Sequence, residues 1–155
     1  MIELYSNDAK RIQHFCKVHS YAKLIAETEN VDKKCLFIIE TAALTHDIGI
    51  HFCEEKYGNC NGKLQEKEGP AIAKKLLEKL GFDKDVSDRV QYLIAHHHTY
   101  DNIDEIDYQI LVEADFLVNI MEDGLSKEAA LKAYHNIFKT SCGKMICREM
   151  FDITR

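Results

Sequence analysis

The chain has 155 residues, of which 46% are hydrophobic and 30% are charged, and its formal net charge is −6. This length and composition are typical of one globular domain with its own core. The acidic balance argues against a nucleic acid or an anionic membrane as the main partner, because both attract basic surfaces. A small phosphorylated ligand stays open, since a local site can be positive inside an acidic protein.

The compartment is predicted from what the sequence lacks. Residues 1–15 show no basic segment followed by an apolar one, the pattern that marks a signal peptide. No stretch approaches the roughly 18 uninterrupted apolar residues of a membrane span. None of the six cysteines forms a CxxC pair. We therefore expect a cytoplasmic protein with free thiols.

Apolar residues recur at three- and four-residue spacing along nearly the whole chain, and there is one proline. This pattern predicts an all-α bundle of about six helices. The first helix is predicted to begin near Asn7 and Asp8, which are good N-cap residues, and to run to about residue 29. The second covers residues 32–48 and ends at Gly49. Residues 51–69 are predicted as a long loop with at most one helical turn, and such loops are often functional.

The second half of the chain is predicted to be helical as well. Pro70 suits the first turn of a third helix over residues 70–80, which Gly81 closes. A fourth helix is predicted over residues 83–98 and a fifth over residues 106–123. The run "SKEAALKAY" opens with a capping Ser126 and an early Glu, so one or two further helices are predicted over residues 126–150.

Four of these helices place histidine or aspartate within or beside their apolar face, as judged from an advance of about 100° per residue. The residues are His14, then His46 with Asp47, then His97 with His98, and finally Asp115. His19, on the same helix as His14, points away from the apolar face.

A single polar residue of this kind has an ordinary explanation. A lone histidine on an apolar face is usually a hydrogen-bonded core residue, and a lone aspartate usually caps a helix or lies at the surface. Four helices with the same feature favour one shared partner, because unpaired buried polar groups are costly and one metal cation between helices removes the cost for all of them. Imidazole and carboxylate ligands suit Fe, Mn, Zn, Co or Ni and do not choose among them.

The segments around these residues resemble a known family. The segments "RIQHFCKVHSYAKLIA", "AALTHDIG", "IAHHH" and "LVEAD" are similar to the motifs of the HD-domain metal-dependent phosphohydrolases. The resemblance runs from about residue 11 to residue 123 and leaves residues 126–150 without a matching motif. It implies that residues 1–155 form a single HD domain, an α-helical bundle that hydrolyses a phosphate ester or anhydride, often of a nucleotide.

The resemblance also implies roles for individual residues. It makes His14, His46, Asp47 and Asp115 the ligands of a divalent transition metal. His97 and His98 match the paired histidines of members that hold two ions.

The segment "QEKEGPAIA" bears on the same question, because Glu68 stands where some relatives have a histidine. It is either a carboxylate ligand of a second ion or a first-turn glutamate that favours the helix dipole.

The expected mechanism is metal-assisted hydrolysis with three catalytic residues. Asp47 is expected to ligate, and to bridge two ions if two bind. His97 and His98 either hold a second ion or contact the phosphate and protonate the leaving oxygen.

The source of the phosphate-binding cation is open, because Ile50 and His51 follow the "HDIG" segment where relatives often carry Lys or Arg. Lys17, Lys56 and Lys63 are candidates, although each also fits a solvated surface.

Two functions of other classes fit the same residues. One is a non-catalytic module that senses a metal or another ligand. The other is an oxygen-activating enzyme with a di-iron site on the same scaffold. The ligand types do not separate these from a hydrolase, whereas phosphate release and iron-dependent O₂ uptake do. The sequence also leaves open the substrate, the metal and the oligomeric state.

Overall fold

The computed structural model describes residues 1–153, and these residues form helices and connecting segments without a strand. The all-α prediction is therefore confirmed. There are eight helices in this part of the chain rather than about six. They are α1 (Ala9–Thr28), α2 (Lys33–Thr45), α3 (Ile50–Tyr57), α4 (Gly62–Lys79), α5 (Lys84–Ile94), α6 (Ile106–Glu122), α7 (Lys127–Asn136) and α8 (Ser141–Met150).

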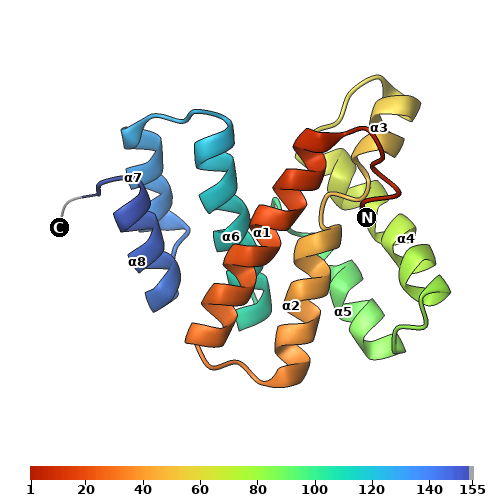
Figure 1. The fold of residues 1–155 in the computed structure, drawn as a ribbon, viewed down its shortest axis with the longest axis horizontal. Helices are drawn as coiled ribbons and strands as arrows, with labels where there is room; N and C mark the ends of the chain where they lie inside the picture. The colour runs from red at the N-terminus through yellow and green to blue at the C-terminus, as the bar shows by residue number, and fades with distance from the viewer. Residues whose placement is uncertain (154–155) are drawn as a thin grey trace.

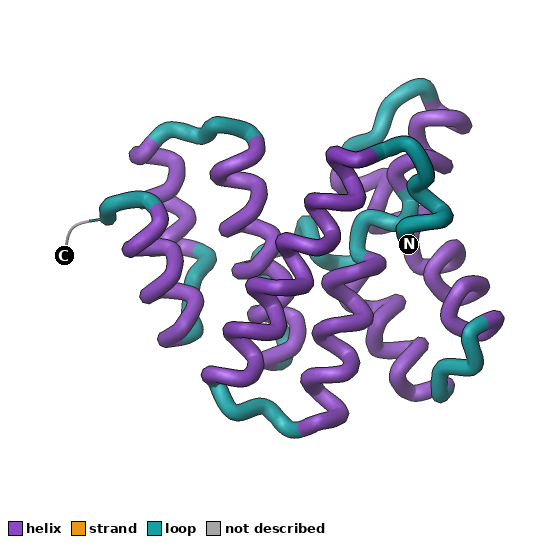
Figure 2. Tube along the Cα trace, viewed as in Figure 1, coloured by secondary structure: helices purple, strands orange, loops and turns teal. Residues whose placement is uncertain are grey.

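The helices pack around a central group formed by α1, α2 and α6. Helix α1 packs against both α2 and α6, and α2 also packs against α5 and α6. In Figure 1, α3, α4 and α5 lie on one side of this group, and the α7–α8 hairpin lies on the other. Short connections join most helices, and the longest, residues 95–105, joins α5 to α6 (Figure 2).

Several helices begin where capping residues predict. The Asp8 side chain accepts a hydrogen bond from the Arg11 amide at the start of α1, and the Ser126 side chain accepts one from the Ala129 amide at the start of α7. These side chains satisfy amides that have no partner within the helix. Helix α6 spans residues 106–122, one residue shorter than predicted.

The predicted loop over residues 51–69 is wrong, because this stretch contains α3 and the first half of α4. Helix α4 begins after Asn61, whose side chain caps the Leu64 amide, and Pro70 lies inside it. A proline within a helix costs a hydrogen bond and adds a steric clash. Helix α4 nonetheless continues through Pro70 and packs against α3. Gly49 allows the two backbones to approach closely, because a Cβ there would lie only 3.1 Å from the Gly69 nitrogen, whereas a Cβ on Gly69 would meet the Ile94 side chain at 2.8 Å.

The fourth predicted helix is also too long, since α5 ends at Ile94 and residues 95–98 form a turn. Tyr108 on α6 holds this turn, because its hydroxyl donates to the carbonyl oxygens of His96 and Thr99. His97 and His98 therefore project from a turn and not from a helical face.

Helix α6 is the most enclosed element, with twelve buried residues between Asp107 and Ile120. A second apolar stretch, Lys33–Tyr57, is long and apolar enough to cross a membrane by length and composition alone. In the fold it comprises α2, a turn and α3, and half of its most apolar window is buried within the protein. Core helices of globular proteins are also apolar and largely buried, so they can have the same length and composition as a membrane span.

Candidate metal centre

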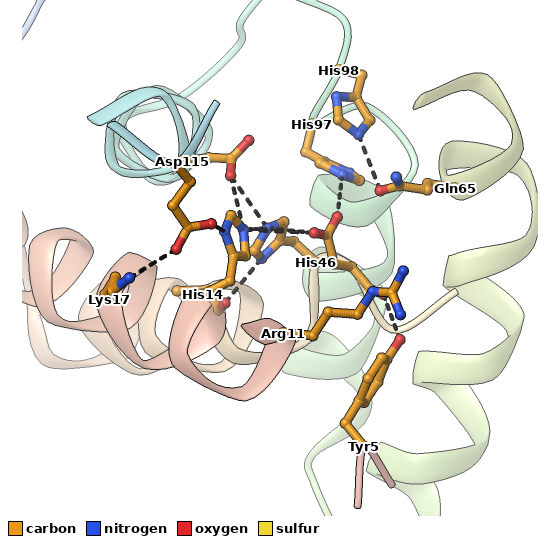
Figure 3. A network of polar contacts seen from close by, with 12 residues as sticks. Tyr5, Arg11, His14, Lys17, His46, Gln65, His97, His98 and Asp115 are labelled. Carbon is orange, nitrogen blue, oxygen red and sulfur yellow. Dashed lines mark hydrogen bonds and ion pairs between the residues drawn. The ribbon is translucent and has the colours of Figure 1, made fainter. Parts of the chain in front are cut away.

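Four of the residues singled out in the sequence meet between α1, α2 and α6 (Figure 3). We call them the first cluster: His14 on α1, His46 and Asp47 directly after α2, and Asp115 on α6. The two Nε2 atoms of His14 and His46 lie 3.3 Å apart. They lie 3.3 and 3.5 Å from Asp115 Oδ1, and 3.6 and 3.5 Å from Asp47 Oδ2.

These separations are close to those of atoms that share one ion. Two donors at about 2.1 Å from a metal are about 3.0–3.4 Å apart when the angle between the bonds is about 90–110°. The distances between donors in the first cluster, 3.3–3.6 Å, are therefore at or slightly above this range. The side chains are largely enclosed, with 10% of His14, none of His46, 13% of Asp47 and 6% of Asp115 exposed.

The imidazoles of His14, His46 and His97 are each held through the Nδ1 atom. His46 Nδ1 lies 3.0 Å from the Ala43 carbonyl oxygen, and His97 Nδ1 lies 2.7 Å from that of Ile94. His14 Nδ1 lies 3.0 Å from Oε2 of Glu122. Because each partner is an acceptor, Nδ1 carries the proton, and Nε2 presents a lone pair to the centre of the site.

Two buried atoms of the site have no hydrogen-bond partner within the described residues: Asp115 Oδ1 and His97 Nε2. The reason is that their nearest polar neighbours are also acceptors. Asp115 Oδ1 faces the lone pairs of His14 and His46, and His97 Nε2 lies 3.4 Å from Asp47 Oδ1. Facing acceptors need a cation or a proton between them. The residues present therefore fit a bound divalent metal.

The pKa values of these side chains also indicate that the site is stabilised by positive charge. Burial opposes ionisation of Asp47, but the adjacent His46 and His97 lower its pKa to about 2. Burial likewise opposes ionisation of Asp115, yet His14 and His46 hold its pKa far below the usual range. Burial disfavours the charged form of His46, but Asp47 and Asp115 raise its pKa to about 9. Without a metal, a proton on His46 supplies the missing charge.

A second cluster adjoins the first and consists of Asp47, His97 and His98, whose ligand atoms lie within 4.8 Å of one another. Asp47 belongs to both clusters, with Oδ2 facing the first and Oδ1 facing His97. Burial, followed by the neighbouring His97, lowers the pKa of His98 to about 4, so this imidazole is neutral at pH 7.

Helix α4 positions the turn that carries the second cluster. His98 Nε2 lies 3.1 Å from Gln65 Oε1 (Figure 3). Glu66 Oε1 accepts hydrogen bonds from the His98 amide and the Thr99 hydroxyl, both at 3.0 Å. The His98 ring packs on Gly62, where a Cβ would lie 2.8 Å from the ring. The first turn of α4 can approach the histidine only because residue 62 is glycine.

Two residues considered from the sequence lie outside both clusters. Glu68 accepts hydrogen bonds from the Tyr57 hydroxyl at 2.5 Å and from Lys56 at 3.4 Å. His19 pairs with Glu40 at 3.0 Å. The structure thus brings His14 rather than His19 to the other candidate ligands.

Sequence reasoning missed the residues that support the site, above all Gln65, Glu66 and Glu122. Gln65 lies in the same "QEKEGPAIA" segment as Glu68. Its position one helical turn before Gly69 is the only local feature of the sequence that could have drawn attention to it. The N-terminal segment was missed too: the Tyr5 hydroxyl donates to the Asp47 carbonyl oxygen at 2.8 Å and so holds the backbone of the residue that both clusters share.

A cavity of about 650 Å³ lies elsewhere, between α1, α2 and the C-terminal part of α4. Its lining is mainly apolar and includes Phe15 and Thr45, but no residue of either cluster. Among the described residues, the groups of three or more candidate ligands lie outside this cavity, so we locate the candidate site by its ligand atoms and not by the size of this cavity.

Comparison with protein families identifies the chain's family. A family model described as HD domain matches residues 11–135, which include every residue of both clusters. Comparisons with curated proteins and with solved structures gave no match.

Proposed function

The chain belongs to the HD-domain family, and we propose that it is a cytoplasmic, metal-dependent phosphohydrolase. Its substrate would be a phosphate ester or anhydride, namely a nucleotide or another small phosphorylated metabolite. The observation that carries the proposal is the buried Asp115 Oδ1, which has no hydrogen-bond partner among residues 1–153 and faces the imidazoles of His14 and His46. A buried set of acceptors with this geometry is suited to a divalent cation.

The metal, one ion or two, would be held by His14, His46, Asp47 and Asp115, with His97 and His98 available for a second. When bound there, Fe, Mn, Zn, Co or Ni supplies Lewis acidity that lowers the pKa of a water molecule and polarises a phosphoryl oxygen. The chain itself orients the imidazoles of His14, His46 and His97 through Nδ1 and directs one Asp47 oxygen toward each cluster.

The neutral state of His98 narrows the roles of the paired histidines. An imidazole with a pKa of about 4 is in its neutral form at pH 7 and not in the charged form that donates a proton. It therefore suits coordination or a hydrogen bond to the phosphate better than protonation of a leaving oxygen. We propose that His98 binds an ion or the phosphate and does not act as the acid that protonates the leaving oxygen.

Among the three lysines considered from the sequence, we propose Lys63 as the one that binds the phosphate. Lys17 is engaged by Glu122 at 3.0 Å and Lys56 by Glu68 at 3.4 Å. Lys63 is exposed, has no ion pair within residues 1–153, and follows Gly62, which packs on His98. It also stands in the first turn of α4, where the helix dipole favours anions.

The direct test is metal analysis followed by turnover. Protein freed of metal with a chelator is reloaded with each candidate metal, and phosphate release is measured against nucleoside mono-, di- and triphosphates and simple phosphoesters. His14→Ala should lose metal and turnover, whereas the matched control His19→Ala should keep both. Metal binding without phosphate release from any compound contradicts the hydrolase. O₂ uptake by the iron form would then favour oxygen activation.

The role of Lys63 has its own test. Lys63→Gln should raise KM several-fold while kcat and metal content stay close to wild type, because the contact is made to the substrate and not to the metal ligands. Lys74→Gln, farther along the same helix, is the control and should change neither parameter.

A further inference from the structure

We propose that Glu122 is a positioning residue for the metal: its carboxylate fixes His14 and increases the affinity of the first cluster for a divalent cation. This inference rests on the proposed metal-binding role of the first cluster, but it does not depend on which reaction follows.

The contacts of Glu122 join two helices at the site. Glu122 is the last residue of α6, and its Oε2 lies 3.0 Å from His14 Nδ1. Its Oε1 accepts a hydrogen bond from the Lys17 ammonium, also at 3.0 Å. Only 14% of the Glu122 side chain is exposed. Both oxygens are thus occupied, and the carboxylate is held in one orientation toward the histidine.

The spacing along each helix makes this arrangement possible. His14 and Lys17 are three residues apart on α1, so both face α6. Asp115 and Glu122 are seven residues apart on α6, which places them two turns apart on one face. Helix α6 therefore supplies one ligand of the first cluster and also the group that orients another.

Glu122 differs in kind from the partners of the other imidazoles. His46 and His97 each place Nδ1 against a backbone carbonyl three residues earlier, which is a neutral acceptor. His14 alone of these three has a charged acceptor. A carboxylate draws the Nδ1 proton more strongly than a carbonyl, which makes the opposite Nε2 atom a better electron-pair donor to a metal.

The test is a Co²⁺ titration of the full chain, with the dissociation constant from calorimetry and the visible absorption of bound Co²⁺ as a second readout. Glu122→Gln keeps the size of the side chain and a hydrogen-bond acceptor but removes the charge. Its Kd for Co²⁺ should rise about 10- to 100-fold. Glu122→Asp keeps the charge but draws it back by one methylene, so its Kd should rise less, by several-fold.

The matched control is Glu40→Gln. Glu40 lies 3.0 Å from His19 and 3.1 Å from Lys23, the same carboxylate, histidine and lysine arrangement at a place with no metal ligand. If Glu122 were only structural, both Gln variants would lower the melting temperature of the metal-free protein and leave the Kd unchanged.

The outcomes separate this inference from the proposed function. Wild-type Kd values in both Glu122→Gln and Glu122→Asp overturn the positioning role. If the wild-type protein itself binds no Co²⁺, the proposed metal centre fails and the inference fails with it. A raised Kd in the Glu122 variants, with a wild-type Kd in Glu40→Gln, supports the inference whether or not any phosphate ester is hydrolysed.

Discussion

Replacing Asp47 by Asn should remove most of the stabilisation that a bound metal gives the folded protein. The substitution nearly preserves the volume of the side chain, but it removes a negative charge. Asp47 is one of the two carboxylates of the first cluster and is the residue that the second cluster shares with it. Loss of one partner of a buried charge pair typically costs about 3–5 kcal/mol. We therefore expect the metal Kd to rise by more than about 100-fold.

The expected size of the thermal effect follows by mass action. At a free metal concentration of 100 times the wild-type Kd, binding stabilises the folded state by about 2.7 kcal/mol. For a domain of this length each kcal/mol shifts the melting temperature by about 2–4 °C, so the wild-type protein should gain roughly 5–11 °C. With a 100-fold weaker Kd, the same metal concentration contributes about 0.4 kcal/mol, or roughly 1 °C.

The assay is thermal unfolding with and without metal, and each variant is compared with its own metal-free form. This comparison cancels any change in the stability of the metal-free fold. Asp115→Asn should behave like Asp47→Asn. Asp101→Asn is the control, because Asp101 is exposed and lies in neither cluster. Equal metal-induced shifts in wild type and Asp47→Asn would refute Asp47 as a ligand.

Three further predictions concern pH, packing and the C-terminal hairpin. The folded-state pKa of His46 is about 9 and its unfolded value is about 6.5. The metal-free protein should therefore lose stability as pH rises through 9, whereas the stabilisation by bound metal should grow. Melting temperatures measured at pH 6 to 10, with a chelator or with metal, check this. Gly62→Ala should displace the His98 ring, which would lie 2.8 Å from the new Cβ, and lower kcat in the phosphate-release assay with little change in the fold by circular dichroism. Glu113→Ala should lower the free energy of unfolding by about 3 kcal/mol or more in urea, because the amides of Lys139 and Thr140 lose a buried charged acceptor, while metal affinity stays unchanged.

The sequence predicts the parts of this fold that depend on local patterns. Helix α1 begins after its Asp8 cap, and α6 lies within one residue of its predicted bounds, because both carry long apolar stripes. The prediction of a loop over residues 51–69 is wrong because α3 and the start of α4 are polar on their exposed sides. Pro70 also suggested a helix start where there is a helix interior. The close approach of Gly49 and Gly69 is a tertiary contact that no local rule reveals.

The same limit applies to the candidate site. Its candidate ligands could be singled out because four helices place histidine or aspartate within or beside their apolar faces, and this combination favours one shared partner. The groups that orient them could not, since Glu122 is 108 residues from His14 and Glu66 is 32 residues from His98. A glutamate near a helix end has many uses, and only the packing of α6 on α1 selects this one.

The two clusters differ in how their parts are anchored, and this has a consequence for motion. His14 and Asp115 project from long helices, and α6 is buried along most of its length. His97 and His98 instead project from a turn of four residues that is held from outside by Glu66 and Tyr108. Backbone amides of α6 should therefore exchange with solvent only on global unfolding, whereas those of residues 95–99 should exchange through smaller, local openings. We therefore expect local opening in the half of the candidate site that residues 95–99 carry, and not in the half that α1 and α6 carry.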